Sequence, residues 1–178
     1  MHPLDIRPIP PDDADRYRAL MLEAYASHPD AFTSSVDERR ALPIAWWTRR
    51  LDGGPSAPER LLGAFVGERL AGSIGVGFDA REKARHKATL FGLYVPAPDR
   101  GRGIGRRLAE AAIDLARARP GIRVLQLTVT EGNDGAEALY RSCGFSRFGR
   151  EPMAVAVAGG FVTKLHLWRT LTRPGPAP

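Results

Sequence analysis

The residues with the clearest chemical potential stand in one short run, DRGRGIGRRL, at residues 99–108. Glycines alternate here with arginines, and an apolar pattern with helical spacing begins at Ile104. The first N–H groups of a helix lack intrahelical partners and lie at the positive end of its dipole, so they suit a phosphate. The glycines at 101, 103 and 105 let a ligand approach the backbone, and the arginines add positive charge. The run therefore predicts a phosphate-binding helix N-terminus.

Two common phosphate motifs do not fit this run. A Walker A loop requires G-x-x-x-x-G-K-[ST], which does not occur in the sequence. The spacing G-x-G-x-G also differs from the Rossmann fingerprint, and the strand before it belongs to a meander late in the fold. A glycine-rich turn that binds no phosphate remains the alternative at this point.

A second stretch with chemical potential is VTEGNDGAEALYRSCGF, at residues 129–145, which follows the next expected strand. Asn133 stands where a helix cap is expected, and its amide could equally hold a ligand. Tyr140 offers a phenol with an ordinary pKa of about 10, which is near enough to the ~8.5 of a thiol for proton exchange. The alternative is that Tyr140 only packs its ring and anchors its hydroxyl. Cys143 is interpreted as a small buried hydrophobe.

Taken together, the two stretches resemble the GNAT superfamily of acetyl-CoA-dependent N-acetyltransferases. The acyl-CoA loop of that family, R/Q-x-x-G-x-G/A, is matched by Arg100, Gly103 and Gly105. A later family pattern, N-x-x-A-x-x-L-Y followed by G-F, is matched within residues 133–145. The close resemblance covers roughly residues 87–148, whereas the N-terminal helices identify no acceptor.

The resemblance implies acetyl-CoA as co-substrate, no metal, and direct attack of a primary amine on the thioester. It places the N–H of Val95 at the oxyanion and makes Tyr140 the general acid. The acceptor stays open between a small metabolite, an antibiotic and a peptide or protein amine. The cofactor-binding residues that it implies are Leu93, Tyr94, Val95, Arg100, Gly101, Arg102, Gly103, Ile104, Gly105, Arg106, Asn133 and Tyr140.

The sequence does not define the general base. Glu38 is our candidate, because the resemblance places its region over the acceptor site. Glu131, which follows a strand of the cleft, and His86, at the entry of another strand, are alternatives. Each of the three is also a plausible solvated surface residue, and a water chain to bulk solvent would serve without any of them.

A non-catalytic acyl-CoA sensor or interaction module of the same fold is the alternative function, since it needs the same loop. The net charge of +6 and the pI near 10.1 favour an anionic partner. No basic run is interleaved with aromatic residues, so we do not expect nucleic acid as the main partner. The apolar segment 154–171 suggests a homodimer surface.

The remaining composition points to a cytoplasmic protein. No apolar run approaches the ~20 residues that a membrane span needs, and the N-terminus is no signal peptide, so no membrane partner is expected. The chain has a single cysteine, which excludes an intramolecular disulfide and fits a reducing compartment.

The candidate site residues can act together only if the fold brings the ends of two strands and the start of one helix close to each other. We expect a helix that starts near Asp12 and stops before Pro29, and a second helical stretch at roughly 36–51 that Pro43 divides. Because a helical crossover joins parallel strands, those at 87–95 and 122–129 should be neighbours, and the resemblance implies that they splay apart. The other expected elements are a strand at 6–9, a hairpin at 61–78, helices starting at 104 and 135, and a last hairpin at 153–171.

These elements predict the fold class. It is a mixed α/β, GNAT-like fold whose central, mostly antiparallel sheet is flanked by helices. We expect a single N-acetyltransferase domain at residues 1–171 and a disordered tail at 172–178.

Overall fold

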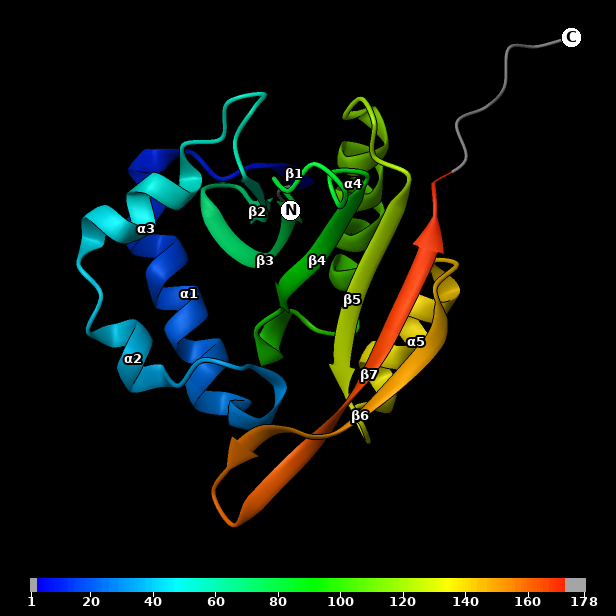
Figure 1. The fold of residues 1–178 in the computed structure, drawn as a ribbon. Helices are drawn as coiled ribbons and strands as arrows, with labels where there is room; N and C mark the ends of the chain where they lie inside the picture. Colours follow the sequence, from blue (N-terminus) through cyan, green and yellow to red (C-terminus); the bar gives the residue numbers. More distant parts are fainter. Residues whose placement is uncertain (1–2, 172–178) are drawn as a thin grey trace, which may run out of the picture.

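The computed structural model describes residues 3–171. A seven-stranded sheet in the order β1-β2-β3-β4-β5-β7-β6 forms its centre (Figure 1). The strands are β1 (Leu4–Pro8), β2 (Glu59–Val66), β3 (Arg69–Phe78), β4 (Lys87–Tyr94), β5 (Val124–Thr130), β6 (Ser146–Val157) and β7 (Gly160–Thr170). The helices are α1 (Ala14–Ser27), α2 (Val36–Arg40), α3 (Ile44–Leu51), α4 (Ile104–Ala118) and α5 (Asp134–Ser142), with short 3-10 turns η1 (Pro11–Asp13), η2 (Pro29–Ala31) and η3 (Ala97–Asp99).

The predicted fold class is confirmed by this topology. Every strand pair is antiparallel except β4 and β5, which are parallel and joined by the crossover helix α4. The helical stretch that follows residue 35 is broken at Pro43, as its lost N–H and fixed φ require. No described helix is long and apolar enough to cross a membrane.

The two parallel strands separate after a short contact. Only Lys87–Thr89 of β4 pair with β5, against Val124–Gln126. A register shift between Ser73 and Gly75 of β3 leaves one extra residue in β4, where Gly92 has a φ of +64°. Such a bulge bends the strand, and a glycine adopts the positive φ without strain. The expected splay is therefore present: it begins after Thr89, and the bulge at Gly92 lies within it.

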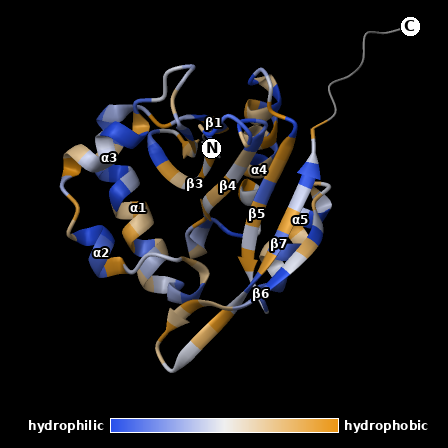
Figure 2. Cartoon of the chain, viewed as in Figure 1, coloured by the Kyte–Doolittle hydropathy of each residue, from blue (hydrophilic) through white to orange (hydrophobic). Residues whose placement is uncertain are grey.

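Helices cover both faces of the sheet and form two cores. On one face, α4 and α5 bury a cluster with β2 to β5 that includes Leu62, Ile74 and Leu108. On the other face, α1 and α3 bury a cluster that includes Tyr17 and Trp47. Alternate residues of a strand point to opposite faces, which is why one strand contributes to both cores. By contrast, α2 has no buried residue and is largely hydrophilic (Figure 2).

The final hairpin is longer than the sequence indicates. We expect it to begin at Met153, but β6 begins at Ser146. The strand continues through Gly149 and Pro152 because its pairing with β7 shifts register near each of these residues instead of ending there. Phe148, Met153 and Phe161 of this hairpin are exposed apolar side chains. The homodimer stays a prediction, and the expected tail at 172–178 lies outside the described residues.

Candidate active site

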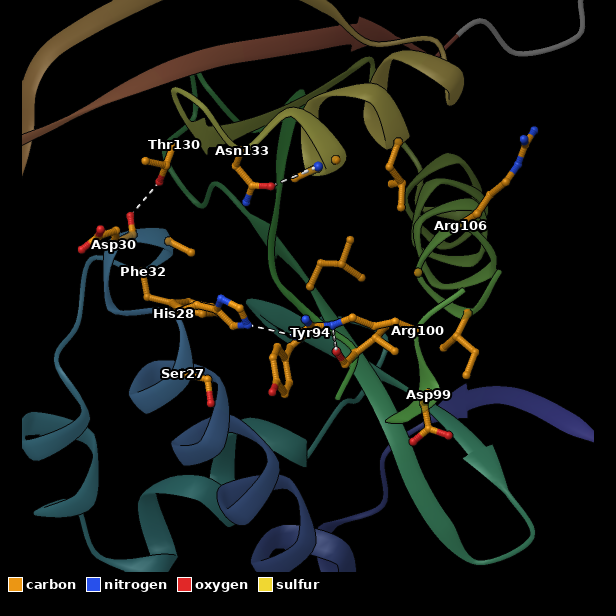
Figure 3. Close-up of a pocket in the computed structure, with 18 of the residues that line it drawn as sticks. Ser27, His28, Asp30, Phe32, Tyr94, Asp99, Arg100, Arg106, Thr130 and Asn133 are labelled. Atoms are coloured by element: carbon orange, nitrogen blue, oxygen red, sulfur yellow. Dashed lines mark hydrogen bonds between the residues drawn. The ribbon is translucent and has the colours of Figure 1, made fainter. Parts of the chain in front are cut away.

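A large cavity opens where β4 and β5 separate, between the start of α4 and the end of α1 (Figure 3). Its volume is about 940 Å³. It is lined by residues 27–32, 93–95, 99–101, 103–106, 130–133, 135, 136 and 139. Most of the predicted cofactor residues are among them, so the two stretches that resemble GNAT motifs meet in space.

The N-terminus of α4 opens on this cavity without a side-chain cap. Gly103 is its N-cap residue, with a φ of +74°, and Gly101 has the same φ. A Cβ on either glycine would meet no atom within 4 Å, so the backbone conformation rather than crowding within the chain requires glycine there. At Gly105 a Cβ would lie 3.2 Å from Leu139 Cδ1. The first amides of α4 are thus available to an anion.

Three arginines near this helix end have different roles. Arg100 lines the cavity, donates from Nε to the carbonyl oxygen of Val95 at 3.0 Å, and lies 2.9 Å from His28 Nε2. Arg106 lines the cavity and donates from Nε to Glu110 at 2.8 Å. Arg102 is not among the lining residues, because its guanidinium turns away to a carboxylate in the preceding turn.

That carboxylate belongs to Asp99, which is only 2% exposed. Arg69 of β3 donates to both of its oxygens, at 2.6 and 2.8 Å, and Arg102 donates at 3.0 Å. The hydrogen bonds from Arg69 are the main cause that lowers the pKa of Asp99, so the carboxyl is ionised at neutral pH. The predicted role of Arg102 in cofactor binding therefore has no support from its side chain, which fixes the glycine loop through Asp99.

The strand side of the cavity comes from residues 93–95, after the bulge at Gly92. The phenol of Tyr94 points away from it and donates to Glu23 of α1 at 2.8 Å. Burial, together with this hydrogen bond, raises the pKa of Tyr94. Leu93 and Val95 are only partly buried and line the cavity, so their backbone can form one wall of the cleft.

Asn133 combines both of the roles considered for it. Its Oδ1 accepts a hydrogen bond from the N–H of Ala136 at 3.2 Å, which caps α5. The same residue lines the cavity, where its amide nitrogen is visible in Figure 3. The cap is confirmed, and a contact to the cofactor stays a prediction.

A second cavity of about 310 Å³ adjoins the first across the splayed strands. Six residues line both, namely Ala31, Phe32, Leu93, Thr130, Asn133 and Ala136. Tyr140 lines the second cavity only and is 5% exposed, with its ring edge-on to Phe145. Burial raises the pKa of its phenol, and no hydrogen bond from the described residues contributes to that shift. The phenol is neutral at physiological pH and keeps a proton to donate.

None of the base candidates lies in a favourable place. Glu38 is exposed, lines neither cavity, and accepts from the N–H of Ser35 at 2.8 Å in a capping box at the start of α2. Glu131 lines the first cavity, but Arg150 donates to both of its oxygens at 2.7 Å and lowers its pKa. His86 lines neither cavity. The structure thus gives the assignment of Glu38 as base no support.

Several site residues were not identified from the sequence. Gly92 could have been, because a glycine inside an apolar strand is a sign of a bulge. Arg39 and Lys164 line the second cavity with no motif to mark them. Asp99 lies in the run at 99–108, but its role in holding the glycine loop depends on its burial and on its ion pair with Arg69, thirty positions away.

Comparisons with known proteins agree with this geometry. A family model described as "Acetyltransferase (GNAT) family" matches residues 18–145. The N-alpha-acetyltransferase RimI of Mycobacterium tuberculosis is 47% identical over 117 residues, which cover 66% of this chain and 69% of that protein. A mycothiol acetyltransferase of Clavibacter michiganensis is 34% identical over 137 residues, which cover 75% of this chain but only 40% of that protein.

Solved structures show the same fold. An acetyltransferase of the GNAT family from Streptococcus pneumoniae superposes with a TM-score of 0.84 at 27% identity, covering 96% of this chain and all of that one. The yncA protein of Salmonella typhimurium, a putative acetyltransferase solved with its cofactor acetyl-CoA, superposes with a TM-score of 0.79 at 21% identity, covering 99% of this chain and 98% of that one.

Proposed function

This chain belongs to the GNAT family of acetyltransferases and is an acetyl-CoA-dependent N-acetyltransferase, and on that premise we propose how its two cavities divide the reaction. The first cavity holds the co-substrate and the second admits the amine. The observation that carries this division is the uncapped N-terminus of α4, which opens on the larger cavity only.

The residues of the first cavity fit a nucleotide thioester. The amides of residues 103–106, with the nearby charges of Arg100 and Arg106, would hold a diphosphate. The backbone of Leu93 and Val95 would pair with the amides of an extended arm, as an added strand does. Acetyl-CoA supplies the thioester whose acetyl group is transferred. The N–H of Val95 would stabilise the negative charge that develops on the thioester oxygen.

We assign to Tyr140 the proton transfer that completes the reaction. The amine nitrogen forms a bond to the acetyl carbon, the carbon–sulfur bond breaks, and the phenol of Tyr140 gives its proton to the leaving sulfur. The phenolate then regains a proton from the ammonium nitrogen of the adduct or from water. Because burial disfavours a lasting phenolate, proton donation and recovery are closely coupled. The second cavity contains no Asp or Glu among its described lining residues, so we propose that the amine enters neutral from solvent.

Release of thiol from acetyl-CoA, measured across a panel of primary amines, tests this proposal. We expect amine-dependent thiol release at a rate well above background, with an acetylated product of matching mass. Binding of CoA to the same preparation is measured in parallel by calorimetry. CoA binding without thiol release for any amine would instead support the non-catalytic acyl-CoA module.

A further inference from the structure

We infer that the acceptor is a small amine that carries a carboxylate, and that Arg39 binds this carboxylate in the second cavity. This inference rests on the proposed function and narrows its acceptor class.

The second cavity carries an excess of positive charge. Arg39, Arg50 and Lys164 line it, and no Asp or Glu does among the residues that the structure describes. Arg50 is neutralised by Glu59, to which it donates at 2.6 and 3.1 Å. Arg39 and Lys164 take part in no ion pair within residues 3–171. Two cations in a small cavity, without a carboxylate of the chain, favour an anionic ligand.

Arg39 has a donor that the fold leaves unsatisfied. Its Nη2 donates to Ser34 Oγ at 2.8 Å, but its Nε is buried and has no hydrogen-bond partner among residues 3–171. The Cζ atom of Arg39 lies 4.9 Å from the centroid of the Trp46 ring, so the ring helps to hold the guanidinium in place. A buried donor without a partner is costly, and a carboxylate is the group that a guanidinium edge binds best. Arg39 therefore lines the cavity with a guanidinium whose charge and hydrogen-bonding capacity the described residues use only in part.

Lys164 contributes charge rather than a free donor. Its Nζ is buried and donates to Thr130 Oγ1 at 2.7 Å, to the carbonyl oxygen of Ala31 at 3.0 Å and to that of Asp30 at 3.4 Å. An ammonium has three N–H groups, so these contacts use all of them. The ammonium thus raises the potential of the cavity while Arg39 supplies the direct hydrogen bond.

The placement of Arg39 and Tyr140 orients the acceptor. Arg39 belongs to α2 and Tyr140 to α5, which lie on opposite sides of the divergence between β4 and β5 (Figure 1). An amine that reaches the thioester near Tyr140 would extend its carboxylate toward Arg39. The volume of about 310 Å³ suits a metabolite of amino-acid size.

The test compares matched acceptors. Each of the free α-amino acids is assayed with acetyl-CoA beside its α-amide and its methyl ester, which keep the amine and lose the negative charge. For the best acceptor we expect kcat/KM to exceed that of its neutral partners by about 10- to 100-fold, the range for one charged hydrogen bond. Arg39→Met should remove this preference by lowering kcat/KM for the acid far more than for its neutral partners, and the KM for acetyl-CoA should be unchanged because Arg39 does not line the first cavity.

Two further variants separate recognition from folding. Arg39→Lys keeps the charge and should restore part of the preference. Arg40→Met removes the neighbouring arginine of the same helix, which is 59% exposed and paired with Asp37, and should behave as wild type. Equal rates for acids and neutral partners, or a preference unaffected by Arg39→Met, would overturn the inference while leaving the transferase function intact.

Failure of the transferase function has a different signature. If no amine releases thiol, the melting temperature is measured with CoA and the same acids and amides. Stabilisation by the acids that is lost in Arg39→Met would then support the anion site without transferase activity. Absence of any such stabilisation would overturn the inference as well.

Discussion

The two cavities are built by different means. The first takes its anion-binding groups from one continuous run, residues 99–106, and uses mainly backbone amides held by glycine conformation. The second gathers side chains from α1, α2, α3, β4, β5, α5 and β7. The cofactor cavity therefore depends on local backbone geometry, whereas the acceptor cavity depends on side chains from distant parts of the chain that the fold brings together. Changes in each cavity should affect different kinetic quantities.

Among changes that should affect the two cavities differently, Tyr140→Phe should have the largest effect. Removing the phenolic proton should lower kcat by about 100-fold or more, the usual range for loss of a general acid. CoA affinity should stay within about twofold, since Tyr140 does not line the first cavity. Steady-state kinetics and calorimetry measure the two quantities. Ser142→Ala, which removes an exposed hydroxyl from the same helix, is the control, and unchanged turnover in Tyr140→Phe would remove Tyr140 from the mechanism.

A Gly103→Ala variant tests the role of the backbone at the start of α4 in the first cavity. A side chain at a φ of +74° costs about 1–2 kcal/mol, so the loop should relax and CoA affinity should fall by about tenfold. Gly121→Ala is the matched control, because Gly121 has a φ of +87°, equally open surroundings, and lies beyond the other end of α4. Both variants should lose similar stability. Equal CoA affinity in the two variants would contradict the role of the helix start.

Loss of the carboxylate under the glycine loop should have a smaller effect. Asp99→Asn leaves Arg69 and Arg102 without their shared partner, and both are about half exposed, so we expect a loss of only about 1–2 kcal/mol in unfolding free energy. CoA affinity should fall a few-fold as the loop loosens. Chemical denaturation measures the first quantity, with Asp114→Asn as the control, because Asp114 pairs with Arg117 on the exposed side of α4. A stability equal to wild type would contradict this role of Asp99.

The same carboxylate predicts a dependence of stability on pH. The pKa of Asp99 is lowered in the folded chain, so the folded state binds fewer protons than the unfolded state. The stabilisation is complete well above the unfolded value of about 3.9 and is lost as the pH falls through the lower folded value. The difference in unfolding free energy between wild type and Asp99→Asn should therefore shrink below about pH 4, and a constant difference would contradict the ion pair.

The smallest expected effect is the absence of an alkaline decline in activity. Burial raises the pKa of Tyr140, so the phenol stays protonated beyond the range in which ordinary tyrosine ionises. The rate should rise with pH as the amine loses its proton, with no decline up to about pH 9. A pH profile of kcat measures this, and a descending limb between pH 7 and 9 would indicate a different acid.

The sequence predicts the first cavity far better than the second for a physical reason. Gly101, Gly103 and Gly105 act within a single turn, so their spacing alone carries the information. Arg39 and Lys164 stand 125 positions apart in the sequence. From the sequence alone, a lysine within β7 is expected to face solvent, and only the packing of η2 against β5 and β7 shows that Lys164 is buried. Glu38 shows the converse, because its local capping signal determines its place at the start of α2, while its assignment as base stays a prediction that the cavities do not support.

In the fold, too, the features that the sequence predicts are the locally encoded ones. The parallel pairing of β4 with β5 through a helical crossover follows from periodicity and connection length, and it is confirmed. The sequence does not predict the position of β7 between β5 and β6. The bulge at Gly92 and the long, irregular β6 depend on how strands fit against partners far along the chain.

A crystal structure of the protein with acetyl-CoA tests the central claim most directly. We predict that the diphosphate lies within hydrogen-bonding distance of the backbone N–H groups of residues 103–106, with Arg100 and Arg106 beside it. A diphosphate bound away from the start of α4 would contradict the assignment of the first cavity, and with it the division of the reaction between the two cavities.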